Sequence, residues 1–365
     1  MGNEALGKWL ARRGGELRLA LRTTLAGLIT FLLAHALQLP QGYWAVLTSV
    51  IIIQASVGGS LKVGLDRLIG TLAGAIWGVA VALAVPHDSL LLLGTALALA
   101  LAPLSILAAF RPSFRLAPVT AIIMLLSTSG SQLGPFAYAV DRVLEIGLGC
   151  VIGLTVSLLV LPGRAHGLLG DAAAKAVRIL AEMLESLLRD PASVPDRAAI
   201  VALHDKLRRA ITAVETLAEE ARRERAHRLT DAPDPEPVAR NLRRLRHDLV
   251  ATSRAVAEPL PAPGLHYLGR ALADLQGAIV AFLRTSAEAF AARRPPPLLA
   301  PVESALAAFG EAIGALRRSG VLRELGDDAV GRIFGLAFAL QQMREDLADL
   351  ADRIAERSLG GAVRA

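Results

Sequence analysis

The chain has 365 residues, of which 53% are hydrophobic and 4% aromatic, and its mean hydropathy is +0.48. That hydropathy is too high for an ordinary soluble domain. The formal net charge is +6 at pH 7, but no basic stretch is interleaved with aromatic residues, so nucleic acid is not expected as a partner. The one cysteine, Cys150, lies in an apolar run, which excludes an intrachain disulfide and a cysteine metal cluster.

The charged residues divide the chain into two parts. Residues 1–162 hold ten Lys or Arg and six Asp or Glu, whereas residues 163–365 hold 29 and 27. We therefore expect a cytoplasmic N-terminal segment at 1–18, a transmembrane domain at 19–162 and a cytoplasmic helical domain at 163–365.

Six apolar stretches in the first part are candidate membrane spans, because about 20 apolar residues cross a bilayer as a helix. They are residues 19–37, 43–57, 68–85, 89–110, 116–129 and 138–161. Lys and Arg occur before the first stretch, in the second and fourth connections (58–67 and 111–115) and after the last stretch. This alternation predicts six spans with both termini in the cytoplasm of a bacterial inner-membrane protein.

The first stretch has a second interpretation. Its basic start, short apolar run and Ala34-His35-Ala36 are also typical of a cleaved signal peptide. Cleavage there would leave five spans.

The third and sixth stretches open on the same pattern, an Asp-Arg pair followed by two glycines one turn apart, at an offset of 75 residues. The members are Asp66, Arg67, Gly74 and Gly78 in one copy, and Asp141, Arg142, Gly149 and Gly153 in the other. A repeat of three spans is odd-numbered, so its second copy would be inverted in the membrane, as in many secondary transporters. The alternative is chance similarity between closely packed, glycine-spaced membrane helices.

The second and fifth stretches are the shortest and occupy equivalent places in the two copies. Short spans in corresponding positions indicate the binding site of a transporter. Their polar ends supply four candidate substrate-binding residues: Gln54, Ser56, Ser127 and Ser129. The alternative is a pair of tilted helices with ordinary loops.

Ionisable residues inside membrane spans are costly and usually face the interior of the helix bundle. Arg67 and Arg142 are candidate substrate-binding residues, because the planar guanidinium suits a carboxylate. Asp66, Asp141 and Glu145 are candidates for proton coupling, because a carboxyl group in an apolar environment can hold a proton. The same residues could instead be interface anchors or structural ion pairs.

Tyr43 and Trp44 begin the second stretch. They are either part of the aromatic belt at the outer membrane face or a stacking surface for an aromatic substrate.

After residue 163 the apolar residues recur every three or four positions, which predicts amphipathic helices. We expect helices at 167–189, 195–229, 236–258, 264–294, 298–318 and 327–357, divided by proline-rich breaks and packed as an antiparallel bundle. No nucleotide-binding fingerprint or catalytic motif is present. We therefore expect neither an enzyme nor a cofactor or metal site.

Three stretches of the first part resemble one known family. They are Tyr43-Trp44-Ala45-Val46-Leu47-Thr48, Gln54-Ala55-Ser56-Val57-Gly58 and Arg67-Leu68-Ile69-Gly70-Thr71-Leu72-Ala73-Gly74. Together they resemble the fusaric acid resistance and aromatic acid exporter family over residues 20–162, and the helical tail resembles it only in architecture. The resemblance implies export of aromatic carboxylic acids, often with a periplasmic adaptor protein. By matched position it points to Tyr43, Trp44, Gln54, Ser56 and Arg67.

The chain departs from this family in two respects. Many members have proline where Ala55 stands here. Larger members have two membrane modules, so a homodimer is expected for a chain with one.

These features together predict an all-α membrane protein that exports small, aromatic carboxylic acids by a secondary, proton-linked mechanism. Its partners would be the organic anion and membrane lipid. One alternative is a passive organic-anion channel. Another is a membrane-anchored scaffold whose helical domain binds a partner.

Overall fold

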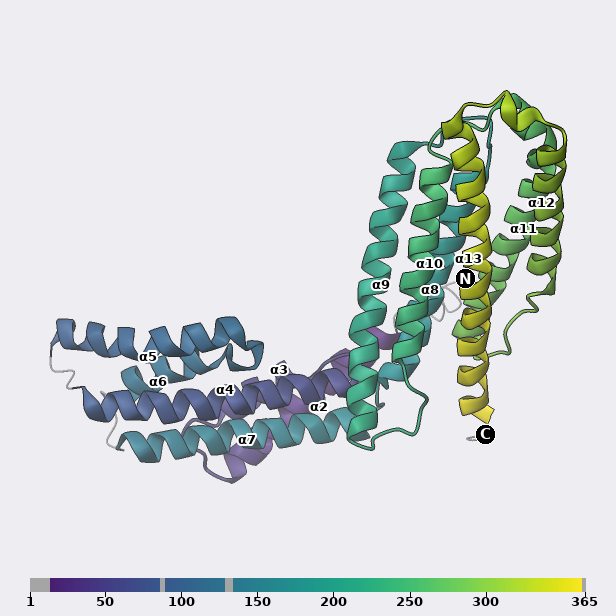
Figure 1. Cartoon of the computed structure of the whole chain (residues 1–365). Helices are drawn as coiled ribbons and strands as arrows, with labels where there is room; N and C mark the ends of the chain where they lie inside the picture. The colour runs from purple at the N-terminus through teal and green to yellow at the C-terminus, as the bar shows by residue number, and fades with distance from the viewer. Residues whose placement is uncertain (1–13, 86–88, 129–133, 363–365) are drawn as a thin grey trace, which may run out of the picture. The chain divides into compact units, whose positions relative to one another are not determined.

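The computed structural model describes residues 14–85, 89–128 and 134–362, which form α-helices joined by short turns (Figure 1). The chain divides into two compact units, Met1–Ala165 and His166–Ala365. Each unit has its own core, and each is described by itself below.

The first unit consists of apolar helices. They are α2 (Gly14–Ala36), α3 (Tyr43–Ile52), α4 (Val57–Ala84), α5 (Leu90–Phe110), α6 (Ala117–Thr128) and α7 (Pro135–Leu159), with a 3-10 turn at Pro112–Phe114. Four of them, α2, α4, α5 and α7, are long and apolar enough to cross a membrane. Helices α3 and α6 have 10 and 12 residues, so the two stretches expected to be shortest are the shortest.

The prediction of a loop over residues 58–67 was wrong, because α4 begins at Val57. The hydroxyl of Ser56 accepts a hydrogen bond from the Gly59 amide at 2.9 Å and caps the helix. The two glycines and the charged Lys62, Asp66 and Arg67 suggested a loop, but all of them lie in α4. Arg67 is therefore a helical residue well inside α4 and not part of a connection.

Glycines bring α4 against α6. A Cβ at Gly74 would collide with the Ala117 carbonyl and with Thr120, and a Cβ at Gly78 would lie 2.9 Å from the Cβ of Met124. The two helices approach this closely because neither glycine has a side chain.

The same arrangement recurs between α7 and α3. A Cβ at Gly149 would collide with the Ala45 carbonyl and with Thr48, and a Cβ at Gly153 would lie 2.6 Å from Ile52. Each of these α3 residues precedes its α6 counterpart by 72 residues, and the glycines of α4 precede those of α7 by 75. The spacing of the sequence pattern is thus also the spacing of the contacts.

The contacts also give the directions of the helices. Later residues of α7 meet later residues of α3, and later residues of α4 meet later residues of α6, so both pairs are parallel. Helices α4 and α7 are antiparallel, because Gly64 contacts Leu154 while Ser60, earlier in α4, hydrogen-bonds to Ser157, later in α7, at 2.9 Å.

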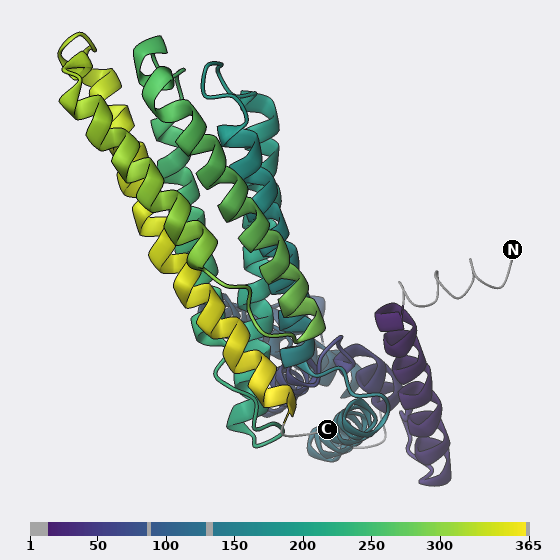
Figure 2. The same ribbon diagram turned by 90° about the vertical axis from the view of Figure 1, so that its right-hand side faces the viewer.

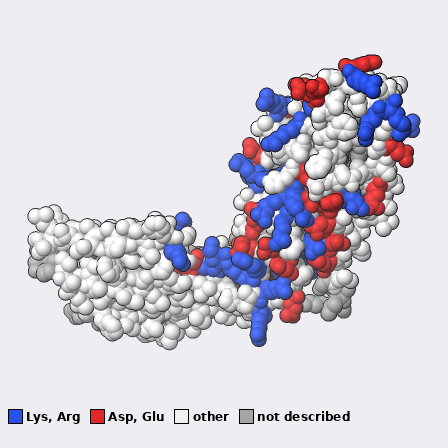
Figure 3. Space-filling model, in the orientation of Figure 1, with Lys and Arg blue, Asp and Glu red and all other residues white. Residues whose placement is uncertain are grey.

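The surface of the first unit is apolar. Figure 3 shows few charged groups on its visible face, whereas both signs of charge are distributed over the second unit. Large side chains such as Ile76, Leu83 and Phe110 are 71% to 80% exposed, which suits contact with lipid rather than water.

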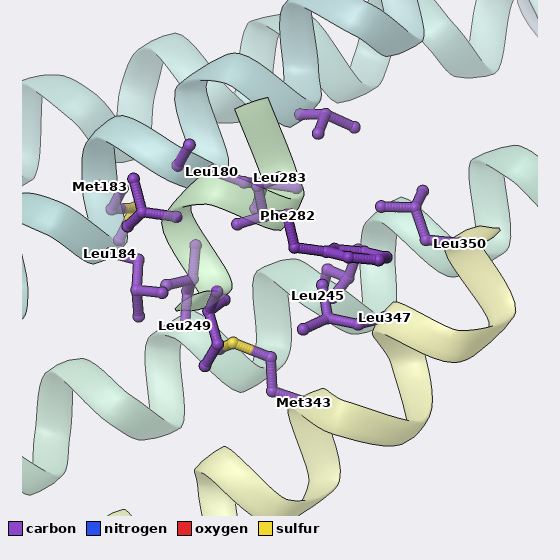
Figure 4. Close-up of a cluster of buried hydrophobic side chains, with 14 of the residues drawn as sticks. Leu180, Met183, Leu184, Leu245, Leu249, Phe282, Leu283, Met343, Leu347 and Leu350 are labelled. Carbon is purple, nitrogen blue, oxygen red and sulfur yellow. The ribbon is translucent and has the colours of Figure 1, made fainter. Parts of the chain in front are cut away.

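The second unit holds α8 (Ala165–Leu188), α9 (Arg197–Ala226), α10 (Glu236–Ala255), α11 (Ala262–Ala292), α12 (Ala300–Arg318) and α13 (Asp327–Ala362), with a 3-10 turn at Val321–Arg323. The helices lie side by side (Figures 1 and 2) around one apolar core. Figure 4 shows Met183, Leu245, Phe282 and Leu347 of that core. All six helices lie where the sequence predicts them, and α13 runs five residues further.

One pair of carboxyl groups lies buried between α10 and α13. Asp248 and Asp346 are 7% and 4% exposed, and their side chains share a hydrogen bond. Burial, this hydrogen bond and the charge of Asp346 raise the pKa of Asp248 to about 7, although Arg244 opposes the shift. Asp248 therefore loses its proton to solvent near neutral pH.

Substitution of Gly149 by alanine should destabilise the first unit. The new methyl group would collide with the backbone of α3, and overpacking of this kind costs about 1–3 kcal/mol. Gly147 is the matched control on the same helix, because a Cβ there meets nothing within 4 Å. Thermal unfolding in nanodiscs should show a lower midpoint for Gly149→Ala and an unchanged or higher one for Gly147→Ala. Equal midpoints would contradict the close contact.

The stability of the second unit should fall as the pH rises through about 7. The folded chain holds the Asp248 proton more tightly than the unfolded chain, where the pKa of aspartate is about 3.9. The free energy of unfolding therefore includes the full contribution of Asp248 when the pH is below the unfolded-state pKa. That contribution is lost as the pH rises through the folded-state pKa.

The measurement is the unfolding midpoint between pH 6 and pH 8.5, which should fall by a few degrees. Asp248→Asn should abolish most of the fall, because an amide donates the hydrogen bond without titrating. Asp274→Asn, on the exposed face of α11, should retain it. An equal fall in all three proteins would show that the pair is not responsible.

Candidate functional site

Arg142 of α7 lies almost fully buried, 2% exposed, against the start of α3. Its Cζ atom lies 3.4 Å from the ring centroid of Trp44, in a cation–π contact. Its Nη1 donates to Oε1 of Gln41 at 3.4 Å. The Tyr43 side chain also hydrogen-bonds to this guanidinium. No described carboxylate forms an ion pair with it.

Glu145 lies one turn further along α7 and is 1% exposed. Its Oε1 accepts the backbone N–H of Gln41 at 2.8 Å. The Gln41 amide oxygen in turn accepts from the Tyr138 hydroxyl at 3.1 Å. Gln41 therefore connects Arg142 and Glu145, which do not pair directly despite their favourable spacing on the helix.

Arg67 of α4 is the repeat counterpart of Arg142 and is 8% exposed. Its Nε donates to the hydroxyl of Thr48 at 3.0 Å. Among the described residues, no carboxylate pairs with it either.

The two arginines meet the same short helix. Trp44 contacts Arg142 and Thr48 contacts Arg67, and residues four apart on a helix are neighbours on one face, roughly 6 Å apart. Helix α3 therefore contacts both candidate anion-binding side chains, which are 75 residues apart in the sequence.

A third arginine is buried in this unit. Arg22 of α2 is 2% exposed, and its Nη2 donates to the Ala55 carbonyl at 3.2 Å. Its Nη1 is buried and has no hydrogen-bond partner among the described residues, and the same holds for the indole N–H of Trp44. Both groups are hydrogen-bond donors, and the described part of the chain offers neither of them an acceptor.

The segment between α3 and α4 is held by hydrogen bonds to its neighbours in the sequence and by one to the distant Gly163. The Gln54 amide donates to the Ser60 hydroxyl at 2.9 Å, and the Gln54 side chain donates to the Ile51 carbonyl at 3.1 Å. The Val57 amide donates to the Gly163 carbonyl at 3.0 Å. In this structure Gln54 and Ser56 thus shape the start of α4.

The remaining predicted residues lie nearer the surface. Tyr43 is 56% exposed, with its ring centroid 5.2 Å from that of Trp44. Asp66, Asp141 and Ser127 are half-buried. Ser129 lies outside the described residues.

Sequence reasoning missed Gln41, Tyr138 and Arg22 as members of this region. Gln41 and Tyr138 are single polar residues with no motif around them. Arg22 was counted with the basic residues at the N-terminus, although it lies inside the stretch at 19–37. Its one signal was its place inside the first apolar stretch, where a charge must find a buried partner.

The model of the fusaric acid resistance protein family matches residues 16–361. The chain belongs to this family. The sequence motifs suggested a likeness confined to residues 20–162. The match runs through both units, so the likeness extends over nearly the whole chain. With its candidate spans, the chain is a membrane protein of the fusaric acid resistance family. No curated protein matches it.

A double-mutant cycle should show coupling between Trp44 and Arg142. Trp44→Leu leaves a buried guanidinium without its ring face, and Arg142→Met then removes that charge. We expect the free energy of unfolding of the double variant to exceed the value obtained by adding the losses of the two single variants, by about 0.5–2 kcal/mol.

Trp77→Leu is the matched control for this cycle. The Trp77 indole donates to the Leu99 carbonyl of α5 at 3.1 Å, whereas the ring in the cation–π contact with Arg142 is that of Trp44. Its effect should therefore add to that of Arg142→Met. Additivity in both cycles, measured by thermal unfolding in nanodiscs, would argue against the cation–π contact.

Proposed function

We propose that this member of the fusaric acid resistance family is a secondary exporter of small organic anions. It would move carboxylates out of the cytoplasm across a bacterial inner membrane. The substrate would bind beside α3, between Arg67 and Arg142.

The charge balance of the buried side chains carries this proposal. Among the described residues of the first unit, the buried charged side chains are three arginines and one glutamate. A buried charge is stable only when it is paired and hydrogen-bonded. Neither Arg67 nor Arg142 pairs with a described carboxylate, and the Trp44 N–H has no acceptor within the described part of the chain. A bound carboxylate would supply the missing negative charge and the missing acceptor.

The helix directions support a six-span topology. If every helix from α2 to α7 crosses the membrane, α3 and α7 must be parallel, α4 and α6 parallel, and α4 and α7 antiparallel. The helix pairs have these directions, as the contacts of Gly74, Gly149 and Ser60 show. We therefore infer two inverted copies of three helices, with both termini and the second unit in the cytoplasm.

The aromatic character of the substrate is proposed from two features. The family resemblance implies aromatic acids. The rings of Tyr43 and Trp44 lie together at the start of α3, where an aromatic body could stack. Glu145, buried one turn from Arg142, is the residue we propose to carry the coupled proton.

The assembly is proposed to be a homodimer, which would supply the second membrane module of larger relatives. Mass photometry in nanodiscs should give the mass of two chains. A periplasmic adaptor remains part of the proposal through the family resemblance alone.

Flux of labelled 4-hydroxybenzoate into proteoliposomes tests the proposal. An imposed pH gradient should drive accumulation by the wild type. Arg67→Ala and Arg142→Ala should each lower the initial rate about tenfold or more, because each removes a charge-assisted hydrogen bond to the carboxylate. Arg111→Ala is the control, since Arg111 is exposed and should leave the rate unchanged.

Glu145→Gln separates coupling from binding. It should abolish accumulation against the gradient while leaving downhill exchange in place. Flux that only dissipates an anion gradient in the wild type would identify a channel. No flux of any organic anion would leave the scaffold interpretation and reject export.

A further inference from the structure

A groove of about 540 Å³ lies between α8 and α9 in the second unit. This volume falls in the range of small-molecule sites, about 300–1,000 Å³. Four basic side chains and one acid line it, above apolar side chains. The lining residues are Ala172, Lys175, Arg178, Ile179 and Glu182 of α8, with Lys206, Arg209, Ala210 and Ala213 of α9.

The basic groups of this groove are not neutralised by the protein. Among the described residues, none of the four forms an ion pair. The neighbouring Arg208 differs, because its Nη2 lies 3.3 Å from Asp205. Glu182 is the one acid in the lining, so the groove holds an excess of three positive charges.

The charges are divided between two walls. Lys175 and Arg178 stand one turn apart on α8, and Lys206 and Arg209 one turn apart on α9. Each lysine–arginine pair can hold one carboxylate. The floor between them is formed by Ile179 and by alanines, which is a surface for an apolar body.

We propose that this groove binds a small organic dianion, with one carboxylate on the α8 pair and one on the α9 pair. An apolar or aromatic body would lie on the floor between them. The site lies wholly within the second unit, so it is separate from the proposed transport site beside α3. Its ligand class overlaps with the proposed substrates, which would let a cytoplasmic organic acid act as an effector of its own export. Only that regulatory role rests on the proposed function, and the binding does not.

Isothermal titration calorimetry on the full chain in detergent tests the binding. The background is Arg67→Ala/Arg142→Ala, which removes the proposed site in the first unit. The probes are isophthalate, with two carboxylates on one ring, benzoate, with one, and inorganic phosphate. Should this background unfold, the same comparison is made in the wild type.

Isophthalate should bind saturably, and benzoate should bind at least about tenfold more weakly, because it engages one pair only. Lys206→Gln/Arg209→Gln should weaken isophthalate binding at least about tenfold by the same reasoning. Arg208→Gln is the matched control on the same helix and should leave the affinity unchanged. All four side chains of the lining pairs are exposed, so the variants should keep the unfolding midpoint of their parent.

Three results would overturn the proposal. They are the absence of saturable isophthalate binding, equal affinity in the groove variant and its control, and tighter binding of phosphate than of isophthalate. The readout is heat of binding and not flux, so a failure of export in proteoliposomes would not produce any of them.

Discussion

The close approach of short helices to long ones, at positions occupied by glycine, is the constraint on which the first unit depends. Gly149 rests on the backbone of α3 and Gly74 on that of α6. Helices in lipid gain little from apolar burial, so contact at this distance is a main source of their association. The contact fixes α7 on α3. Arg142 precedes Gly149 by two turns of α7, and in this arrangement it lies on the ring face of Trp44. A bulkier residue at Gly149 would therefore act on the site as well as on stability.

The same packing creates an imbalance of charge. Arg67 of α4 and Arg142 of α7 contact neighbouring turns of α3, and both are buried without a described carboxylate partner. Glu145 is held instead by the backbone of Gln41. A carboxylate ligand between the arginines would complete the site, and a proton on Glu145 would set how strongly the site holds it. Anion binding and proton coupling would thus arise from one cluster rather than from two separate devices.

Much of this fold could be predicted from periodicity and breakers. The six helices of the second unit were predicted because apolar residues recur every three or four positions between prolines. The start of α4 was not, because Gly58-Gly59 and the charges at 62, 66 and 67 are typical of a loop, while the cap at Ser56 is a single hydroxyl. Arg67 and Arg142 could be proposed from their repeat positions. Gln41 could not, because its role arises from an approach of α7 to the loop before α3 that no local pattern encodes.

We propose above all that an organic anion binds beside α3, between Arg67 of α4 and Arg142 of α7. The most direct test is a cryo-EM structure in nanodiscs with 3-iodo-4-hydroxybenzoate, whose iodine marks the ring. We expect the carboxylate within hydrogen-bonding distance of Arg67 or Arg142, with the ring near Trp44. A ligand bound elsewhere in the first unit, or both guanidinium groups paired with carboxylates of the protein itself, would contradict the account.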